Sequence, residues 1–292
     1  MVFLVVITIS IVTGYYFLVW KDLWRPVLRV NDETISMDYL IRRLKYPYKT
    51  YDIEGMLMTI TIEEFIRQEA PNYGIEVIPD EVDEWLRDEA RGENETISES
   101  EFKAWYRDRL NETQLSNAEY RELVETYILQ ERLDEYLTAG VPTAAEQVHL
   151  YVIFLSPFED AEAALARIED GEDFSELARE LSIDGSAEQG GDIGWWPYLG
   201  GLHENLEYVA FNILEVGQVS DIIGIDEQAQ VYAICLVADR QPDREIEEGK
   251  LETIKDYIFQ AWLNDELDAL DEERFSDDNE TRAWIYLQIE KD

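Results

Sequence analysis

The stretch "GGDIGWW", Gly190 to Trp196, combines three glycines, one acid and two adjacent tryptophans. A phosphate-binding loop needs a following helix and usually a Lys, but here acids crowd both sides and no Lys follows. A nucleophile elbow needs a Ser between glycines, and none occurs. The segment instead predicts a turn at Gly190 and Gly191, where positive φ or close backbone approach is required, leading into a strand at Ile193.

The residues around this turn predict an α+β domain over 146–243 with a small antiparallel sheet. "QVHLYVIFL" and "QVYAICLVADR" are rich in Val, Ile and Tyr, as strands are. Between them lie patterns for three helices. The first has Ser156 as its expected cap and Glu159 as the box partner, the second has Asp173 and Glu176, and the third spans about 206–214.

Residues 27–140 predict a helical domain. A strand at Val27–Val30 turns at Asn31–Asp32 into an amphipathic helix, and capping boxes mark helix starts at Ser98 and Ser116. "TAGVPTA", 138–144, is the clearest linker. The aromatic residues of this domain either pack in its core or line a groove for apolar client segments. Residues 244–292 predict a long amphipathic helix that returns to the helical domain and an acidic tail, in which "AWIYLQI" is a strand or a short helix.

The chain begins with an apolar segment that predicts a transmembrane anchor over 1–24. Residues 2–20 carry no charge and suffice to cross a bilayer as a helix. A cleaved signal peptide is the alternative, but the basic start and the small-residue cleavage site that it needs are absent. Lys21, Arg25 and Arg29 favour a cytoplasmic side for the rest of the chain, although that rule weakens for long translocated domains.

Composition excludes several classes of function. Asp and Glu number 65 against 24 Lys and Arg, a net charge of −41, so nucleic acid is not an expected partner. The acidity fits a saline habitat, attraction of basic or unfolded clients, or one specific basic partner. The single cysteine, Cys235, permits no internal disulfide and is expected to be buried, and with two histidines no zinc or other metal site is expected.

Taken in order, "VHLYVIFL", "GSAEQGGDIGWW", "LEYVAFNILEVGQVSDII" and "VYAICLVADRQP" resemble the parvulin (rotamase) family of peptidyl-prolyl isomerases. The surrounding layout is similar to that of extracytoplasmic foldases. The resemblance implies a cell-membrane protein with a single span, whose bulk lies outside the cytoplasm and acts on X-Pro bonds of unfolded or exported polypeptides. It implies no cofactor.

The resemblance also implies a site. Ile193, Leu202, Leu206 and Phe211 match a pocket for the proline ring, and Asp184 matches a catalytic polar position. Ordinary helix packing is the alternative for the pocket residues. For Asp184 the alternative is an Asx-turn before Gly185.

Two positions depart from the family pattern. Val152 and Ala233 stand, within about one residue, where the family has facing histidines on the first and last strands. His149 does not replace the first, since strand alternation puts it on the other face. His203 lies beside Leu202 and is expected to be a solvated loop residue rather than part of the rim. The two hypotheses are an isomerase that helps exported proteins fold, and a catalytically weak or inactive chaperone or scaffold that retains the fold for binding.

Overall fold

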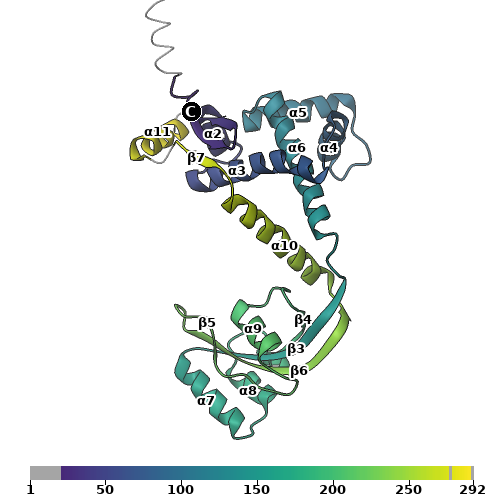
Figure 1. Cartoon of the computed structure of the whole chain (residues 1–292), viewed down its shortest axis with the longest axis vertical. Helices are drawn as coiled ribbons and strands as arrows, with labels where there is room; N and C mark the ends of the chain where they lie inside the picture. The colour runs from purple at the N-terminus through teal and green to yellow at the C-terminus, as the bar shows by residue number, and fades with distance from the viewer. Residues whose placement is uncertain (1–20, 276–277, 291–292) are drawn as a thin grey trace, which may run out of the picture. The chain divides into compact units, whose positions relative to one another are not determined.

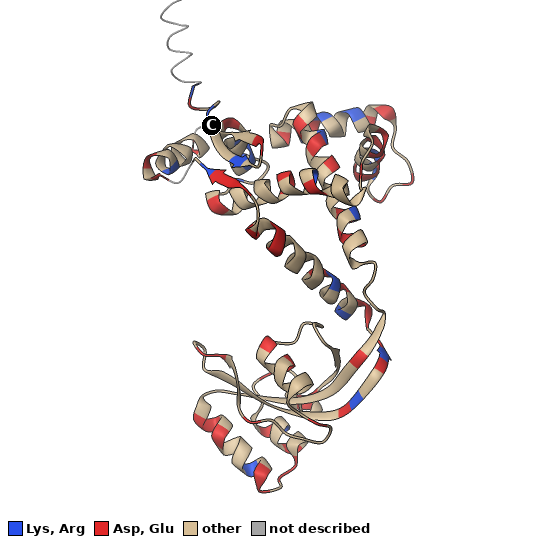
Figure 2. Ribbon diagram, in the orientation of Figure 1, with Lys and Arg blue, Asp and Glu red and all other residues tan. Residues whose placement is uncertain are grey.

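The computed structural model describes residues 21–275 and 278–290 (Figure 1). The chain forms two compact units: one holds the residues up to 136 and those from 262 onward, and the other holds residues 137–261. Acidic side chains are spread over the helices of both units (Figure 2). Within the described ranges, no helix has the length and apolar character to cross a bilayer. The predicted anchor at residues 2–20 lies outside these ranges.

The first unit is mainly helical. Its helices are α2 (Met37–Lys45), α3 (Ile53–Glu69), the 3-10 turn η1 (Ala70–Tyr73), α4 (Pro79–Arg91), α5 (Glu99–Thr113), α6 (Asn117–Thr138) and α11 (Asn279–Ile289). Short connections join the helices from α2 to α6, and α11 comes from the end of the chain. The predicted capping boxes are confirmed, because Ser98 accepts from the N–H of Glu101 at 3.3 Å and Ser116 accepts from that of Glu119 at 3.2 Å. The segment "AWIYLQI" is helical and belongs to α11.

A small antiparallel sheet joins the two ends of this unit. Its order is β2 (Glu33–Ser36), β1 (Pro26–Val30), β7 (Glu272–Arg274). The prediction that a helix starts directly after Asn31–Asp32 is wrong: these residues make a tight turn that pairs Val30 with Glu33, and α2 begins only at Met37. The core of this sheet combines β1 and α2 with Ile285 and Ile289 of α11.

The second unit is built on one antiparallel sheet of order β4-β3-β6-β5. The strands are β3 (Ala144–Leu155), β4 (Asp192–Pro197), β5 (Ile223–Asp226) and β6 (Val231–Glu245). The helices of this unit are α7 (Phe158–Glu169), α8 (Phe174–Leu181), the 3-10 turn η2 (Ala187–Gln189) and α9 (Glu204–Asn212). The expected α+β fold with a small antiparallel sheet is therefore observed. Helix α10 (Glu248–Asp268) has residues in both units.

Strand alternation gives this sheet two apolar faces. Val152, Ala233 and Cys235 pack on the side covered by α9, whereas Ile153 and Ile234 pack under α7 and α8. The α9 side carries the residues that the family resemblance singles out.

Two helix starts in this unit test the local predictions. Asp173 caps α8 as expected, since its carboxylate accepts from the N–H of Glu176 at 2.9 Å. The expected cap of α7 is wrong: Pro157 occupies the cap position in an extended conformation, so the helix starts at Phe158 and Ser156 lies outside it.

Candidate active site

The four residues implied for a proline pocket pack in one apolar cluster on the α9 face. Ile193 comes from β4, Leu202 from the loop before α9, and Leu206 and Phe211 from α9 itself. Leu206 is 1% exposed, whereas the other three are partly buried. Tyr198 meets the ring of Phe211 edge-on, with 5.6 Å between ring centroids. Partly open apolar side chains thus surround a buried leucine, an arrangement that suits a proline ring as well as it suits helix packing.

Asp184 lies in the loop between α8 and η2 and is held by short hydrogen bonds. Its carboxylate accepts from the hydroxyl of Ser182 at 2.6 Å, and from the backbone N–H and hydroxyl of Ser186 at 3.0 and 3.1 Å. Burial alone would raise the pKa of Asp184, but these donors outweigh it and hold the pKa below its ordinary value. The hydrogen bond from the Ser186 N–H to the Asp184 carboxylate forms an Asx-turn. The local turn that the sequence offers as the alternative role for Asp184 is therefore observed.

The loop of Asp184 is fixed to the sheet beside the apolar cluster. Ser182 accepts from the N–H of Phe154 at 2.9 Å, and the N–H of Ile183 donates to the carbonyl of Phe154 at 2.9 Å. The ring of Phe154 packs in the same cluster as the pocket residues. The structure therefore ties an ionised carboxylate and an apolar cluster to the same stretch of β3.

The double glycine closes this region against β3. Gly190 and Gly191 have φ of 71° and 82°, as the sequence predicts, and a Cβ on Gly191 would lie 2.5 Å from the carbonyl oxygen of Val152. The N–H of Val152 donates to the carbonyl of Gly191 at 2.8 Å. Only a residue without a side chain can approach the strand this closely.

The two positions at which the resemblance implies family histidines lie on neighbouring strands. Val152 and Ala233 are both 0% exposed and share the α9 face. They do not face each other, since Val152 pairs with Cys235 and Ala233 pairs with Phe154. The two side chains are therefore diagonal neighbours on the α9 face, two positions from direct pairing.

Cys235 is a free, buried cysteine, as predicted. Its N–H donates to the hydroxyl of Ser220 at 2.9 Å, and burial raises the pKa of its thiol to about 11. Such a thiol stays protonated at neutral pH and fills space as a small apolar group.

Neither histidine replaces the missing pair. His149 lies on the opposite face of β3, as alternation predicts, where its Nε2 is 2.8 Å from Oδ1 of Asp192 and its ring stacks on Trp195 at 5.1 Å. Burial would raise the pKa of Asp192, but hydrogen bonds from His149 and from the Gly194 N–H hold it below its ordinary value. His203 caps α9, with Nδ1 accepting from the N–H of Asn205 at 3.3 Å.

Two residues contact the loops near the predicted pocket but were not predicted from the sequence. Glu207 is buried in α9, and its carboxylate accepts from the N–H of Leu199 at 2.7 Å, which fixes the loop that carries Leu202. Burial raises the pKa of Glu207, although the bond from Leu199 opposes this. Lys250 donates to the carbonyl of Trp195 at 2.6 Å and lies 4.3 Å from the ring of Trp196. No local pattern signals either contact.

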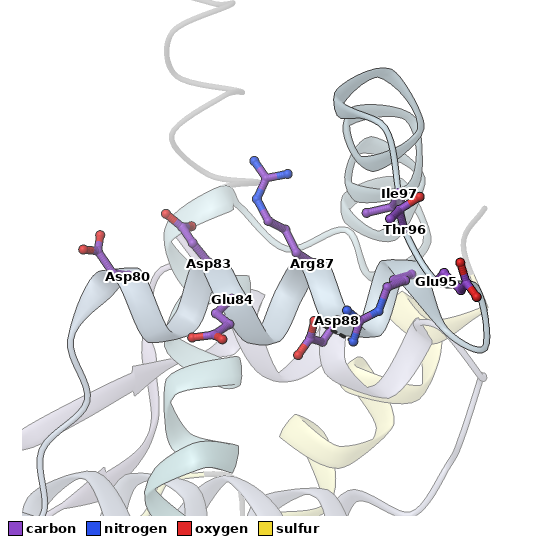
Figure 3. A pocket seen from close by; sticks show the side chains of 9 residues that line it. Asp80, Asp83, Glu84, Arg87, Asp88, Glu95, Thr96 and Ile97 are labelled. Atoms are coloured by element: carbon purple, nitrogen blue, oxygen red, sulfur yellow. Dashed lines mark ion pairs between the residues drawn. The ribbon is translucent and has the colours of Figure 1, made fainter.

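Two cavities have linings that do not include the predicted pocket residues. One of about 480 Å³ borders α9 and the same apolar cluster, since Val209, Leu214 and Ile223 of that cluster line it. The other, of about 550 Å³, lies in the first unit, where acids of α4 and two arginines line an open hollow (Figure 3). Within residues 21–275 and 278–290, no three His, Cys, Asp or Glu side chains gather as metal ligands would.

Comparison with known proteins identifies a family match within the second unit. Residues 158–239 match the rotamase family described as the PPIC-type PPIASE domain. The chain is 29% identical over 269 residues to the foldase protein PrsA of Halalkalibacterium halodurans, an alignment that covers 82% of this chain and 76% of that protein.

Two further proteins are similar. The structure of PrsA from Bacillus cereus covers 92% of this chain and 100% of its own, at 18% identity and a TM-score of 0.48. The peptidyl-prolyl cis-trans isomerase pin4 of Emericella nidulans is 34% identical over 102 residues, which cover 35% of this chain and 78% of that enzyme. With the strand order, the double glycine and the α9 cluster in place, the chain belongs to the parvulin, or PpiC-type rotamase, family of peptidyl-prolyl isomerases.

Proposed function

We propose that this chain is a peptidyl-prolyl isomerase of the foldase kind, which acts on X-Pro bonds of exported polypeptides. The observation that carries the proposal is the apolar cluster of Ile193, Leu202, Leu206 and Phe211, tied through β3 to Asp184. The similarity to a protein named as a foldase supports the choice of client.

A prolyl isomerase site has to lower only the barrier to rotation about the X-Pro bond. Cis/trans isomerisation of an X-Pro bond crosses a barrier of roughly 20 kcal/mol and takes tens of seconds or longer without a catalyst. No bond is broken, so the site needs only to bind the twisted amide better than either planar form. In this proposal Ile193, Leu202 and Phe211 hold the proline ring. Asp184, ionised at neutral pH, sets the electrostatics beside the amide.

We further propose that the chain divides by role. Residues 1–24 form a membrane anchor, 27–140 a helical chaperone-like domain, 146–243 the isomerase domain, and 244–292 the C-terminal helix and tail. The 19 uncharged residues 2–20 support the anchor, and the resemblance of the layout to extracytoplasmic foldases supports an extracytoplasmic site of action. Flotation of the full-length chain with lipid vesicles tests the anchor: a chain that stays at the bottom of the gradient has none.

A second function is favoured by one observation. Val152 and Ala233, at the positions of the family histidines, are fully buried apolar residues, so no hydrogen-bonded pair is present there to orient Asp184. The alternative is therefore a catalytically weak or inactive parvulin-fold chaperone or scaffold.

A protease-coupled prolyl-peptide assay separates the two functions. We expect the wild-type chain to accelerate isomerisation and Asp184→Ala to lose most of that acceleration. Asp173→Ala is the matched control, because it removes an aspartate that also accepts a local backbone N–H but lies at the start of α8. If all three chains match the uncatalysed rate while the wild type still suppresses aggregation of an unfolded client, the isomerase proposal is wrong and the chaperone remains.

A further inference from the structure

Helix α11 is apolar on two opposite sides. Ile285 and Ile289 are buried in the core of the first unit, at 0% and 1% exposure, while Tyr286 and Leu287 on the outer side are 41% and 63% exposed. Residues 283–289 carry no charge in a chain of which 30% is charged. Exposed apolar side chains that lie together often mark a contact surface. The outer side of α11, which the core of the first unit does not cover, is therefore a candidate contact surface.

Other exposed aromatic residues belong to segments that contact α11. The ring of Tyr51 lies 6.3 Å from that of Tyr286, and Tyr48, in the same loop between α2 and α3, is 86% exposed. At the other end of α11, Trp24 is 69% exposed. We call Trp24, Tyr48, Tyr51, Tyr286 and Leu287 the aromatic face.

The residue that follows Trp24 in the chain, Arg25, contacts α11. Arg25 donates to the hydroxyl of Thr281 at 3.2 Å, and its guanidinium lies 5.5 Å from the ring centroid of Trp284. The carbonyls of Leu23 and Arg25 accept from the first N–H groups of α2, at 2.8 and 3.0 Å. The point where residues 21–25 enter the first unit is thus fixed beside the aromatic face.

Charge distinguishes this part of the chain from the rest. Residues 21–49 hold seven Lys and Arg against four Asp and Glu, whereas residues 50–292 hold 17 against 61. Basic and aromatic side chains next to an uncharged apolar segment are the composition of a membrane–water interface. The uncharged segment ends at Trp20, only four residues before Trp24, and four extended residues reach at most about 14 Å.

We propose that the aromatic face is a lipid-contact surface, which lies in the headgroup region of the bilayer that anchors the chain. This inference rests on the proposed anchor at residues 2–20. Tyr and Trp suit this depth because their rings are apolar and their polar atoms reach water. Lys49, beside Tyr51 at 5.6 Å from its ring centroid, suits it for the same reason, since its stem is apolar and its charge stays at the surface.

Depth-dependent fluorescence quenching tests the inference on the full-length chain in phosphatidylcholine vesicles. Tyr48→Cys and Leu287→Cys carry a fluorescent label, and Cys235 is buried and so reacts poorly. The matched control is Ile78→Cys, which is 56% exposed at the start of α4 in the same unit, away from α11 (Figure 1). We expect lipid spin-labelled at the headgroup to quench the labels at 48 and 287 and to leave the label at 78 bright.

The outcomes separate the inference from the proposal beneath it. If the protein does not float with the vesicles, the anchor is absent and the proposed anchoring fails. If it floats but the labels at 48 and 287 are quenched no more than the label at 78, the aromatic face does not touch lipid and the inference is overturned. Cross-links between two copies through position 287, without quenching, would also overturn it and assign the face to self-association. Tyr286→Glu should reduce quenching at position 48 while flotation is unchanged.

Discussion

The backbone of Gly191 lies directly against that of Val152: the N–H of Val152 donates to the Gly191 carbonyl at 2.8 Å, and a Cβ on Gly191 would approach the Val152 carbonyl oxygen to 2.5 Å. This contact docks the loop after α8 on the strand that runs behind the pocket. The double glycine therefore positions the loop that carries Asp184 through its backbone, and any side chain at 191 would push that loop away.

Gly191→Ala is expected to destabilise the fold by about 1–3 kcal/mol, since it combines a positive φ with a backbone clash. Gly194→Ala is the matched control, because Gly194 has a φ of 79° but no atom within 4 Å of the added Cβ. It should cost only about 1 kcal/mol, from the backbone conformation alone. Urea unfolding of the two variants measures the difference, and equal losses would show that the contact with Val152 is not tight.

The sequence predicts those features of the fold that depend on residues close together in the chain. The boxes at Ser98 and Ser116 and the cap at Asp173 each join residues three apart, and the opposite faces of His149 and Val152 follow from strand alternation. These predictions are confirmed because no distant residue contributes to them.

Contacts between residues far apart in the sequence, and irregular contacts, could not be predicted. Strand β7 pairs with β1 across more than 240 residues, through Arg29 and Glu273, and neither segment looks like a partner of the other. The register that pairs Ala233 with Phe154 includes irregularities in β3, and the bond from Leu199 to Glu207 depends on a loop path that no pattern encodes. The roles of Asp184 and of the pocket residues stay predictions from the family resemblance.

Asp184→Asn should make stability less sensitive to acid. The pKa of Asp184 is depressed in the fold from 3.8, so its hydrogen bonds to Ser182 and Ser186 contribute stability at higher pH that is lost as the pH falls below 3.8 through the folded value. We expect the variant to lose about 1 kcal/mol at neutral pH, and the difference from wild type to shrink as the pH falls below 4. Unfolding curves across this range measure it; a difference that does not change with pH would mean that the ionised form of Asp184 is not the one stabilised.

Glu207→Gln should stabilise the protein at neutral pH. The pKa of Glu207 is raised in the fold from 4.5, so the folded state holds its proton more tightly and stability declines as the pH rises through 4.5 toward the folded value. Gln is uncharged, and its Oε1 still accepts from the N–H of Leu199, so it avoids a burial cost on the order of 1 kcal/mol. Thermal unfolding at pH 4 and pH 7 should show the gain only at the higher pH. Glu207→Ala, which leaves the Leu199 N–H without its acceptor, should destabilise at both.

Substitutions of Leu206 and Phe211 distinguish a role in packing from a role in substrate binding within the α9 cluster. Leu206 is 1% exposed, so Leu206→Ala should cost about 2–5 kcal/mol of stability, as large-to-small changes in a core do. Phe211 is only partly buried, so Phe211→Ala should reduce stability less than Leu206→Ala does. It should reduce isomerase activity more, because the proposed function assigns the Phe211 ring to the proline pocket. Activity compared at equal folded fraction, in the peptide assay, distinguishes the two effects. If Phe211→Ala keeps full activity per folded molecule, its ring serves only to pack α9 and the pocket must be sought elsewhere on the domain.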